Sequence, residues 1–203
     1  MSTSGLVRWS GLAAMLGGVL WVIGAIIHAS KPRGCIAEEC VFRPMRETGV
    51  LDGLLMFLSL LLFAVGVVGL VVLVRSVGRF GKVGKTGIIF CAVGAALLVV
   101  ASLIQGLFFG GDFPLMPYFV IPGVLALIVG FLLLGVAILR SGVLPRWAAA
   151  VLIVGALAML GFNEQTAWVL MSIPLGVAWI VVGYLFWSGP RAGEASRPAS
   201  RVR

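Results

Sequence analysis

Long uncharged apolar runs, separated by short segments that contain the charges, dominate the pattern of this sequence. The clearest run lies between Leu54 and Val74, where 21 consecutive residues have no charge. A helix needs about 20 apolar residues to cross the roughly 30 Å hydrocarbon core of a bilayer, because each residue advances about 1.5 Å. This run therefore predicts a transmembrane helix, and similar runs predict five others.

Six transmembrane spans account for the whole pattern. We expect them over residues 12–28, 51–74, 87–109, 116–139, 147–162 and 166–187. The fifth span has 16 residues and is the shortest, so it would stand nearly perpendicular to the membrane or thin the bilayer around it. The first run is longer than the apolar region of a signal peptide, and the segment 28–31 is a poor cleavage site, so we expect a retained helix. Residues 189–203 are expected to form a disordered basic tail.

The composition predicts an all-α integral membrane protein. Apolar residues make up 61% of the 203 residues and charged residues 11%, against roughly 45–50% and about 25% in soluble domains. The formal charge of +8 does not indicate a nucleic-acid partner, because the basic residues lie between apolar runs and not in one patch of a soluble fold. The expected partner is the lipid bilayer.

The distribution of charge orients the spans. With a cytoplasmic N-terminus, the inner side holds eleven of the fifteen basic residues: Arg8, Arg75, Arg79, Lys82, Lys85, Arg140, Arg146, Arg191, Arg197, Arg201 and Arg203. The outer side then holds six of the seven acidic residues: Glu38, Glu39, Glu47, Asp52, Asp112 and Glu164. Basic residues in short loops stay on the cytoplasmic side. We therefore expect both termini in the cytoplasm and a multi-pass protein of the cell membrane, in bacteria the inner membrane.

A basic cluster follows the second span. It consists of Arg75, Arg79, Lys82 and Lys85. Juxtamembrane clusters of this kind attract anionic lipid headgroups. An anionic lipid is therefore one candidate partner.

Arg75 of this cluster lies in a faint internal repeat. Residues 73–78 resemble residues 138–142, and residues 92–95 resemble residues 153–156. The second and third spans would then correspond to the fourth and fifth as parallel hairpins. Chance likeness between apolar helices explains the match equally well.

Small residues recur every seven positions in three of the spans. The stripes are Gly87, Gly94 and Ala101; Gly123 and Gly130; and Gly176 and Gly183. In lipid, small residues let helix backbones approach closely, because helix association there depends on van der Waals contact. The stripes predict helix contacts, with a groove for a lipid or ligand as the alternative.

Two of the three cysteines lie close together in the segment between the first two spans. An oxidising exterior would allow Cys35 and Cys40 to form a disulfide, with Cys91 free. Free thiols and redox or metal chemistry are the alternatives. The spacing is not Cys-x-x-Cys, and adding His28, Glu38 and Glu39 matches no known metal-binding pattern.

Five polar residues lie toward the outer ends of the spans. They are His28, Asp52, Gln105, Tyr118 and Glu164. Polar side chains at membrane depth are costly, so they usually face a wet cavity, and these five form a candidate ligand pocket. Pro122 and Pro174 can bend their helices around such a site. Alternatively, all but Gln105 lie at the level of the headgroups.

No catalytic motif stands out. His28 is the single histidine, so no Ser-His-Asp triad can form, and no His-Glu-x-x-His or phosphate-binding loop is present. We expect no cofactor. The preferred interpretation is a small permease, or a substrate-binding subunit of a transporter, that takes an apolar or amphipathic molecule from outside. A non-catalytic membrane protein that binds a protein partner or its own copies comes second, and a membrane-embedded enzyme third.

Overall fold

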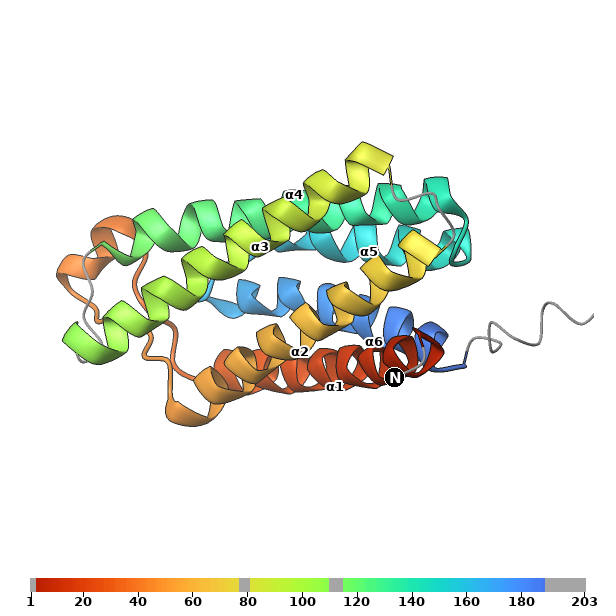
Figure 1. Ribbon diagram of the computed structural model, residues 1–203. Coiled ribbons are helices and arrows are strands. Elements are labelled where there is room, and N and C mark those ends of the chain that lie inside the picture. Colours follow the sequence, from red (N-terminus) through yellow and green to blue (C-terminus); the bar gives the residue numbers. More distant parts are fainter. Residues whose placement is uncertain (1–2, 77–80, 110–114, 189–203) are drawn as a thin grey trace, which may run out of the picture.

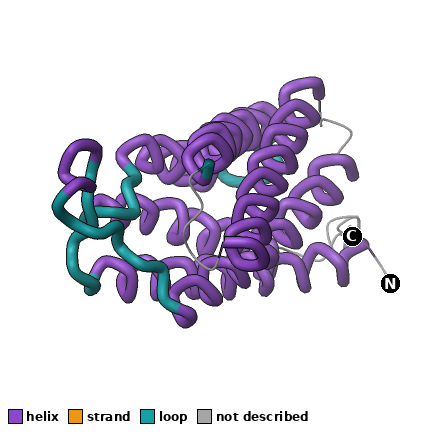
Figure 2. Tube along the Cα trace, turned by 90° about the vertical axis from the view of Figure 1, so that its left-hand side faces the viewer, coloured by secondary structure: helices purple, strands orange, loops and turns teal. Residues whose placement is uncertain are grey.

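The computed structural model describes residues 3–76, 81–109 and 115–188 of the chain. Predictions that concern Arg79, Asp112 and the tail 189–203 lie outside the described residues. Within these ranges the chain is all-α, with no strand (Figure 2). The predicted fold class is therefore confirmed as a helical one.

Six α-helices run along the molecule between its two ends (Figure 1). They are α1 (Thr3–Ala29), α2 (Val50–Ser76), α3 (Gly81–Ile104), α4 (Met116–Ser141), α5 (Arg146–Ala158) and α6 (Ile173–Ser188). Shorter elements connect or extend them: η1 (Ala37–Val41), the π-helix η2 (Gln105–Phe109), η3 (Met159–Gly161) and η4 (Ala167–Ser172). Consecutive helices alternate in direction, so α1 begins and α6 ends at the same end of the bundle (Figure 1).

Five helical segments are long and apolar enough to cross a membrane. They are Gly5–Ala29, Val50–Arg75, Gly81–Ile104, Met116–Ser141 and Ala167–Ser188. The remaining apolar helix, Arg146–Gly161, is shorter and extends about 24 Å at about 1.5 Å per residue. Outward-facing side chains such as Ile26, Val68 and Ile89 are apolar and exposed, as lipid contact requires. The chain is a multi-spanning helical membrane protein.

Several helix ends differ from the predicted spans. Helix α1 begins at Thr3 and α3 at Gly81, so Lys82 and Lys85 lie in the first turns of α3 and not in a loop. Hydropathy locates the apolar part of a helix, whereas backbone hydrogen bonding continues into water. The sixth span begins as the 3₁₀ helix η4, because Pro174 has no N–H to donate to the preceding turn.

The helices pack in an order that differs from their order in the chain. Helix α3 lies against α4, α4 against α5, α5 against α6, α6 against α1, and α1 against α2. No comparable contact joins α2 to α3 among the described residues. The pair α4 and α5 is thus a packed hairpin and the pair α2 and α3 is not, so the proposed duplication stays a prediction.

Glycines of the stripes form close helix contacts, as predicted. A methyl group added at Gly94 in α3 would lie 2.6 Å from the carbonyl oxygen of Gly123 in α4. One added at Gly183 in α6 would lie 2.5 Å from the carbonyl oxygen of Gly11 in α1. These distances leave no room for a side chain, so glycine sets the spacing of both helix pairs. The partner glycines in α1 were not predicted.

Aromatic rings fill the middle of the bundle. Trp179 of α6 is fully buried, its ring stacks on Phe63 of α2 with centroids 5.3 Å apart, and Phe131 of α4 meets it edge-on at 5.6 Å. Trp21 of α1 lies 5.8 Å from Phe63. Ring contacts of this kind are favourable beyond the area they bury. The backbone of α2 lies close to α1 but farther from α4 and α6. The ring contacts therefore join α2 to these two helices.

We expect Gly18→Ala to destabilise the bundle, and Gly24→Ala in the same helix to have little effect. A methyl group at Gly18 would overlap the carbonyl oxygen of Gly176, whereas at Gly24 the nearest atom is Met56 Cγ at 3.3 Å. Overpacking costs about 1–3 kcal/mol, so the melting temperature in mild detergent should fall clearly for Gly18→Ala alone. Equal melting temperatures for the two variants would contradict this packing.

Candidate functional site

Two loops meet at one end of the bundle, which we call the loop end. The first comprises residues 30–49 between α1 and α2, and the second residues 162–166 between η3 and η4 (Figure 1). Hydrogen bonds join them, among them one from the backbone N–H of Arg46 to Gln165 Oε1 at 2.6 Å, across 119 positions of sequence. The loop end is therefore a single folded surface.

A buried carboxylate lies where α1 and α2 meet the loop end. Asp52 is 1% exposed, and its oxygens lie 2.8 and 2.7 Å from Lys31 Nζ and 2.6 Å from His28 Nδ1. His28 lies in the last turn of α1, and Lys31, two residues after the helix ends, donates its backbone N–H to the carbonyl of His28 at 3.3 Å. Positive charge at a helix C-terminus and negative charge at a helix N-terminus are both favourable. The cluster therefore stabilises the ends of two adjacent helices.

The second ring nitrogen of His28 connects this cluster to the other loop. His28 Nε2 lies 3.1 Å from the backbone carbonyl oxygen of Glu164. A carbonyl and a carboxylate both accept hydrogen bonds, so the imidazole satisfies both neighbours when it has a proton on each nitrogen. In that form its positive charge lies directly against Asp52.

Arg46 provides the strongest link between the two loops. Its side chain is 9% exposed and donates to four backbone carbonyls: Pro32 at 2.9 Å, Glu164 at 3.0 Å, Thr166 at 3.0 Å and Lys31 at 3.2 Å. No carboxylate of the described residues lies within ion-pair distance of its guanidinium. Carbonyl dipoles therefore solvate this charge in place of water, and Arg46 holds residues 30–33 against residues 164–166.

The predicted disulfide is confirmed. Cys35 and Cys40 are bonded, with Cα atoms 4.8 Å apart, and Cys91 is a buried free thiol. The bond closes a small ring that contains most of η1. Within the described residues, no group of three or more side chains of the metal-binding types comes together.

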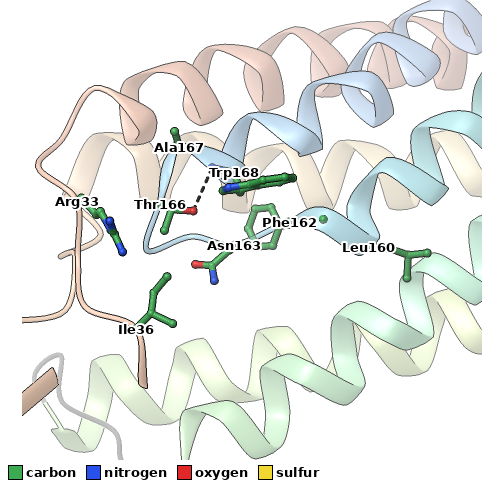
Figure 3. Close-up of a pocket in the computed structure, with 9 residues that line it drawn as sticks. Arg33, Ile36, Leu160, Phe162, Asn163, Thr166, Ala167 and Trp168 are labelled. Atoms are coloured by element: carbon green, nitrogen blue, oxygen red, sulfur yellow. Dashed lines mark hydrogen bonds between the residues drawn. The ribbon is translucent and has the colours of Figure 1, made fainter. Parts of the chain in front are cut away.

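A pocket of about 620 Å³ opens beside Arg46, between the disulfide ring and the second loop. It is lined by Arg33, Ile36, Leu160, Gly161, Phe162, Asn163, Thr166, Ala167 and Trp168. Figure 3 shows Arg33 and Ile36 at one side and Leu160 at the other, with the rings of Phe162 and Trp168 between them. Thr166 Oγ1 accepts a hydrogen bond from the backbone N–H of Trp168, which begins η4. The lining surface is thus about equally polar and apolar, with aromatic and aliphatic side chains beside Arg33, Asn163 and Thr166.

The five predicted pocket residues have different surroundings. His28 and Asp52 come together in the buried cluster, and Glu164 contributes its carbonyl to them while its side chain is exposed. Tyr118 is 75% exposed on α4, and Gln105 is half-buried in the π-helix that ends α3. None of the five lines the pocket described above. Their role in ligand binding stays a prediction.

Sequence reasoning missed the residues that organise the loop end. The position of Lys31, one turn after His28, would have placed it beside Asp52. Arg46 and Arg33 gave no such signal, because a charged residue in a short loop is normally solvated.

Comparison of the chain with protein-family models, with curated proteins and with solved structures finds no match. The function must therefore be argued from the site alone.

We expect Asp52→Asn to lower the stability of the protein in mild detergent. The change leaves Lys31 without its counter-ion and His28 without the carboxylate that its ring contacts, and breaking a buried pair costs about 3–5 kcal/mol. Lys31 is partly exposed, so we expect the lower end of this range. The control is Glu47→Gln, which removes one negative charge from an exposed side chain of the loop just before α2. An Asp52→Asn melting temperature equal to that of Glu47→Gln would contradict a stabilising role.

Proposed function

We propose that this protein binds a small amphipathic molecule at the outer face of a membrane, as a permease or as the substrate-binding subunit of a transporter. The observation that carries the proposal is the pocket of about 620 Å³ at the loop end. Pockets that bind small molecules are usually about 300–1,000 Å³. The volume suits one molecule with a short apolar chain.

The pocket has two chemically different sides. Leu160, Phe162 and Trp168 offer apolar contact, and Trp168 is 57% exposed at an end of the bundle, where membrane and water meet. Arg33 and Asn163 offer hydrogen-bond donors. A molecule that is apolar at one end and polar at the other fits this arrangement.

The orientation belongs to the proposal. Six crossings with both termini in the cytoplasm put the loop end outside. Arg8, Arg75, Arg140 and Arg146 then lie at the cytoplasmic end. The short helix α5, extended by η3, would span a locally thinned bilayer. An oxidising exterior suits the Cys35–Cys40 disulfide.

Anionic lipid at the cytoplasmic end is a further part of the proposal. Arg75, Lys82 and Lys85 are exposed there, and Arg79 lies outside the described residues. The negative surface potential of a cytoplasmic leaflet attracts such side chains. The inner membrane of a bacterium would provide both this surface and the oxidising exterior.

A second candidate function is recognition of a protein partner or of another copy of this chain. Val41, Phe42 and Met45 follow the disulfide ring and are 77%, 92% and 61% exposed. Exposed apolar residues that lie together often mark an interaction site. A membrane-embedded enzyme is the third alternative and has no comparable observation in its favour.

We expect protein purified in mild detergent to retain a small molecule that native mass spectrometry detects. Trp168→Ala should reduce the retained fraction about tenfold, because losing one aromatic contact costs about 1–2 kcal/mol. Trp147→Ala is the matched control, since Trp147 is equally exposed but lies at the start of α5, away from the pocket. Absence of any retained molecule, or equal loss in both variants, would count against a binding function.

We expect Thr48→Cys, but not Ser188→Cys, to react in intact cells with a membrane-impermeant maleimide. Both residues are exposed and lie at opposite ends of the bundle. The unmodified protein should give little labelling, because Cys91 is buried and the other two cysteines are bonded. Labelling of Ser188→Cys alone would reverse the orientation.

A further inference from the structure

The pocket contains a guanidinium that is only weakly engaged. Arg33 Nη2 lies 3.3 Å from both carboxylate oxygens of Glu39, longer than the roughly 2.7–2.9 Å of a strong charge-assisted hydrogen bond. The two side chains are 54% and 52% exposed, so solvent screens the pair. Among the described residues, Arg33 has no other acceptor within hydrogen-bonding distance. Figure 3 shows its guanidinium pointing into the space bordered by Ile36 and Asn163.

A second polar group in the pocket also offers donors. Asn163 Oδ1 accepts a hydrogen bond of 2.8 Å from the backbone N–H of Gln165. The side-chain amide nitrogen of Asn163 can then donate to another group. The described residues give this nitrogen no acceptor. Thr166 Oγ1 is already engaged with the backbone of Trp168. The polar side of the pocket therefore suits a ligand group that only accepts hydrogen bonds.

We infer that the pocket binds a single-chain amphipathic carboxylate, whose headgroup pairs with Arg33 in place of Glu39 and whose chain lies along Phe162 and Trp168. This inference rests on the proposed binding function and specifies its ligand class. A guanidinium fork matches a carboxylate with two parallel hydrogen bonds. The displaced Glu39 stays in the loop as a solvated anion, so a carboxylate headgroup adds one negative charge beside it, whereas a dianionic phosphate adds two.

Glu39 acts as an internal competitor held in place by the disulfide ring. Its backbone N–H donates to the carbonyl of Ile36 at 3.1 Å, inside the loop that Cys35 and Cys40 close. Ile36 lines the pocket from the same ring. The ring therefore positions both the apolar edge of the pocket and the carboxylate that a ligand must displace.

The test is quenching of tryptophan fluorescence by terminally brominated dodecanoate, added to the full chain in mild detergent. Bromine quenches on contact, so a ligand chain beside Trp168 should quench saturably, and the Trp168→Phe variant should lose that component. Arg33→Gln should raise the dissociation constant about tenfold, because it removes the charged partner. Glu39→Gln should lower the dissociation constant about threefold, because it removes the competitor.

Matched controls separate the local pair from general charge effects. Arg43→Gln and Glu38→Gln make the same changes of charge at exposed residues of the same loop that do not line the pocket. Both should leave the dissociation constant within about twofold, since surface charges contribute little. An equal effect of Arg33→Gln and Arg43→Gln would overturn the inference.

Brominated dodecanol and dodecyl phosphate distinguish failure of the inference from failure of the proposed function. We expect the alcohol to bind more weakly and to be insensitive to Arg33→Gln, and the phosphate to compete less well than dodecanoate. Saturable quenching by the alcohol and the carboxylate with equal affinity would leave a binding pocket but reject the carboxylate. Preference for the phosphate would reject it as well. Absence of saturable quenching by every probe would reject both the carboxylate and the pocket.

Discussion

One buried guanidinium holds the loop end together. Arg46 donates to four backbone carbonyls that come from two loops far apart in sequence. A buried carbonyl without a hydrogen-bond donor is costly, and a buried charge without solvation is more costly still. Here the guanidinium supplies donors to the carbonyls, and the carbonyls solvate its charge. Thr166 belongs both to this network and to the pocket lining, so Arg46 fixes the backbone of one residue of the pocket wall.

The neighbouring Asp52 cluster provides partners for a buried carboxylate. The Lys31 ammonium and the His28 imidazole, at and just after the end of α1, both contact one carboxylate at the start of α2, so this buried charge has an ionic partner and a second hydrogen-bond partner. Through His28 and the carbonyl of Glu164, the same cluster reaches the second loop. The two networks therefore both join the first loop or the helix ends to residues 164–166 of the second loop.

The pocket itself contrasts with this rigid support. Arg33 and Glu39 are half-exposed and loosely paired, while Trp168 and Leu160 present apolar surface to solvent. A fixed backbone with weakly paired side chains suits binding. A ligand then has to break only a weak ion pair and does not have to rearrange the loop backbone. Arg33 and Arg46 therefore differ, although both belong to the loop of residues 30–49. Arg46 donates to four backbone carbonyls, whereas Arg33 has only a weak pair with Glu39.

The sequence by itself determined the long apolar helices, and it indicated the glycine stripes and the Cys35–Cys40 disulfide. Run length, the seven-residue spacing of residues such as Gly87 and Gly94, and the nearness of Cys35 to Cys40 are local properties, so they could be predicted. The tertiary structure alone decided the partners of Arg46, the ion pairs of Lys31 and the joining of residues 33–36 with residues 160–168 into a pocket. The contact between two loops depends on hydrogen-bond donors and acceptors that are far apart in the sequence. The periodicity of apolar residues predicts helices but not which loop a charged side chain will contact.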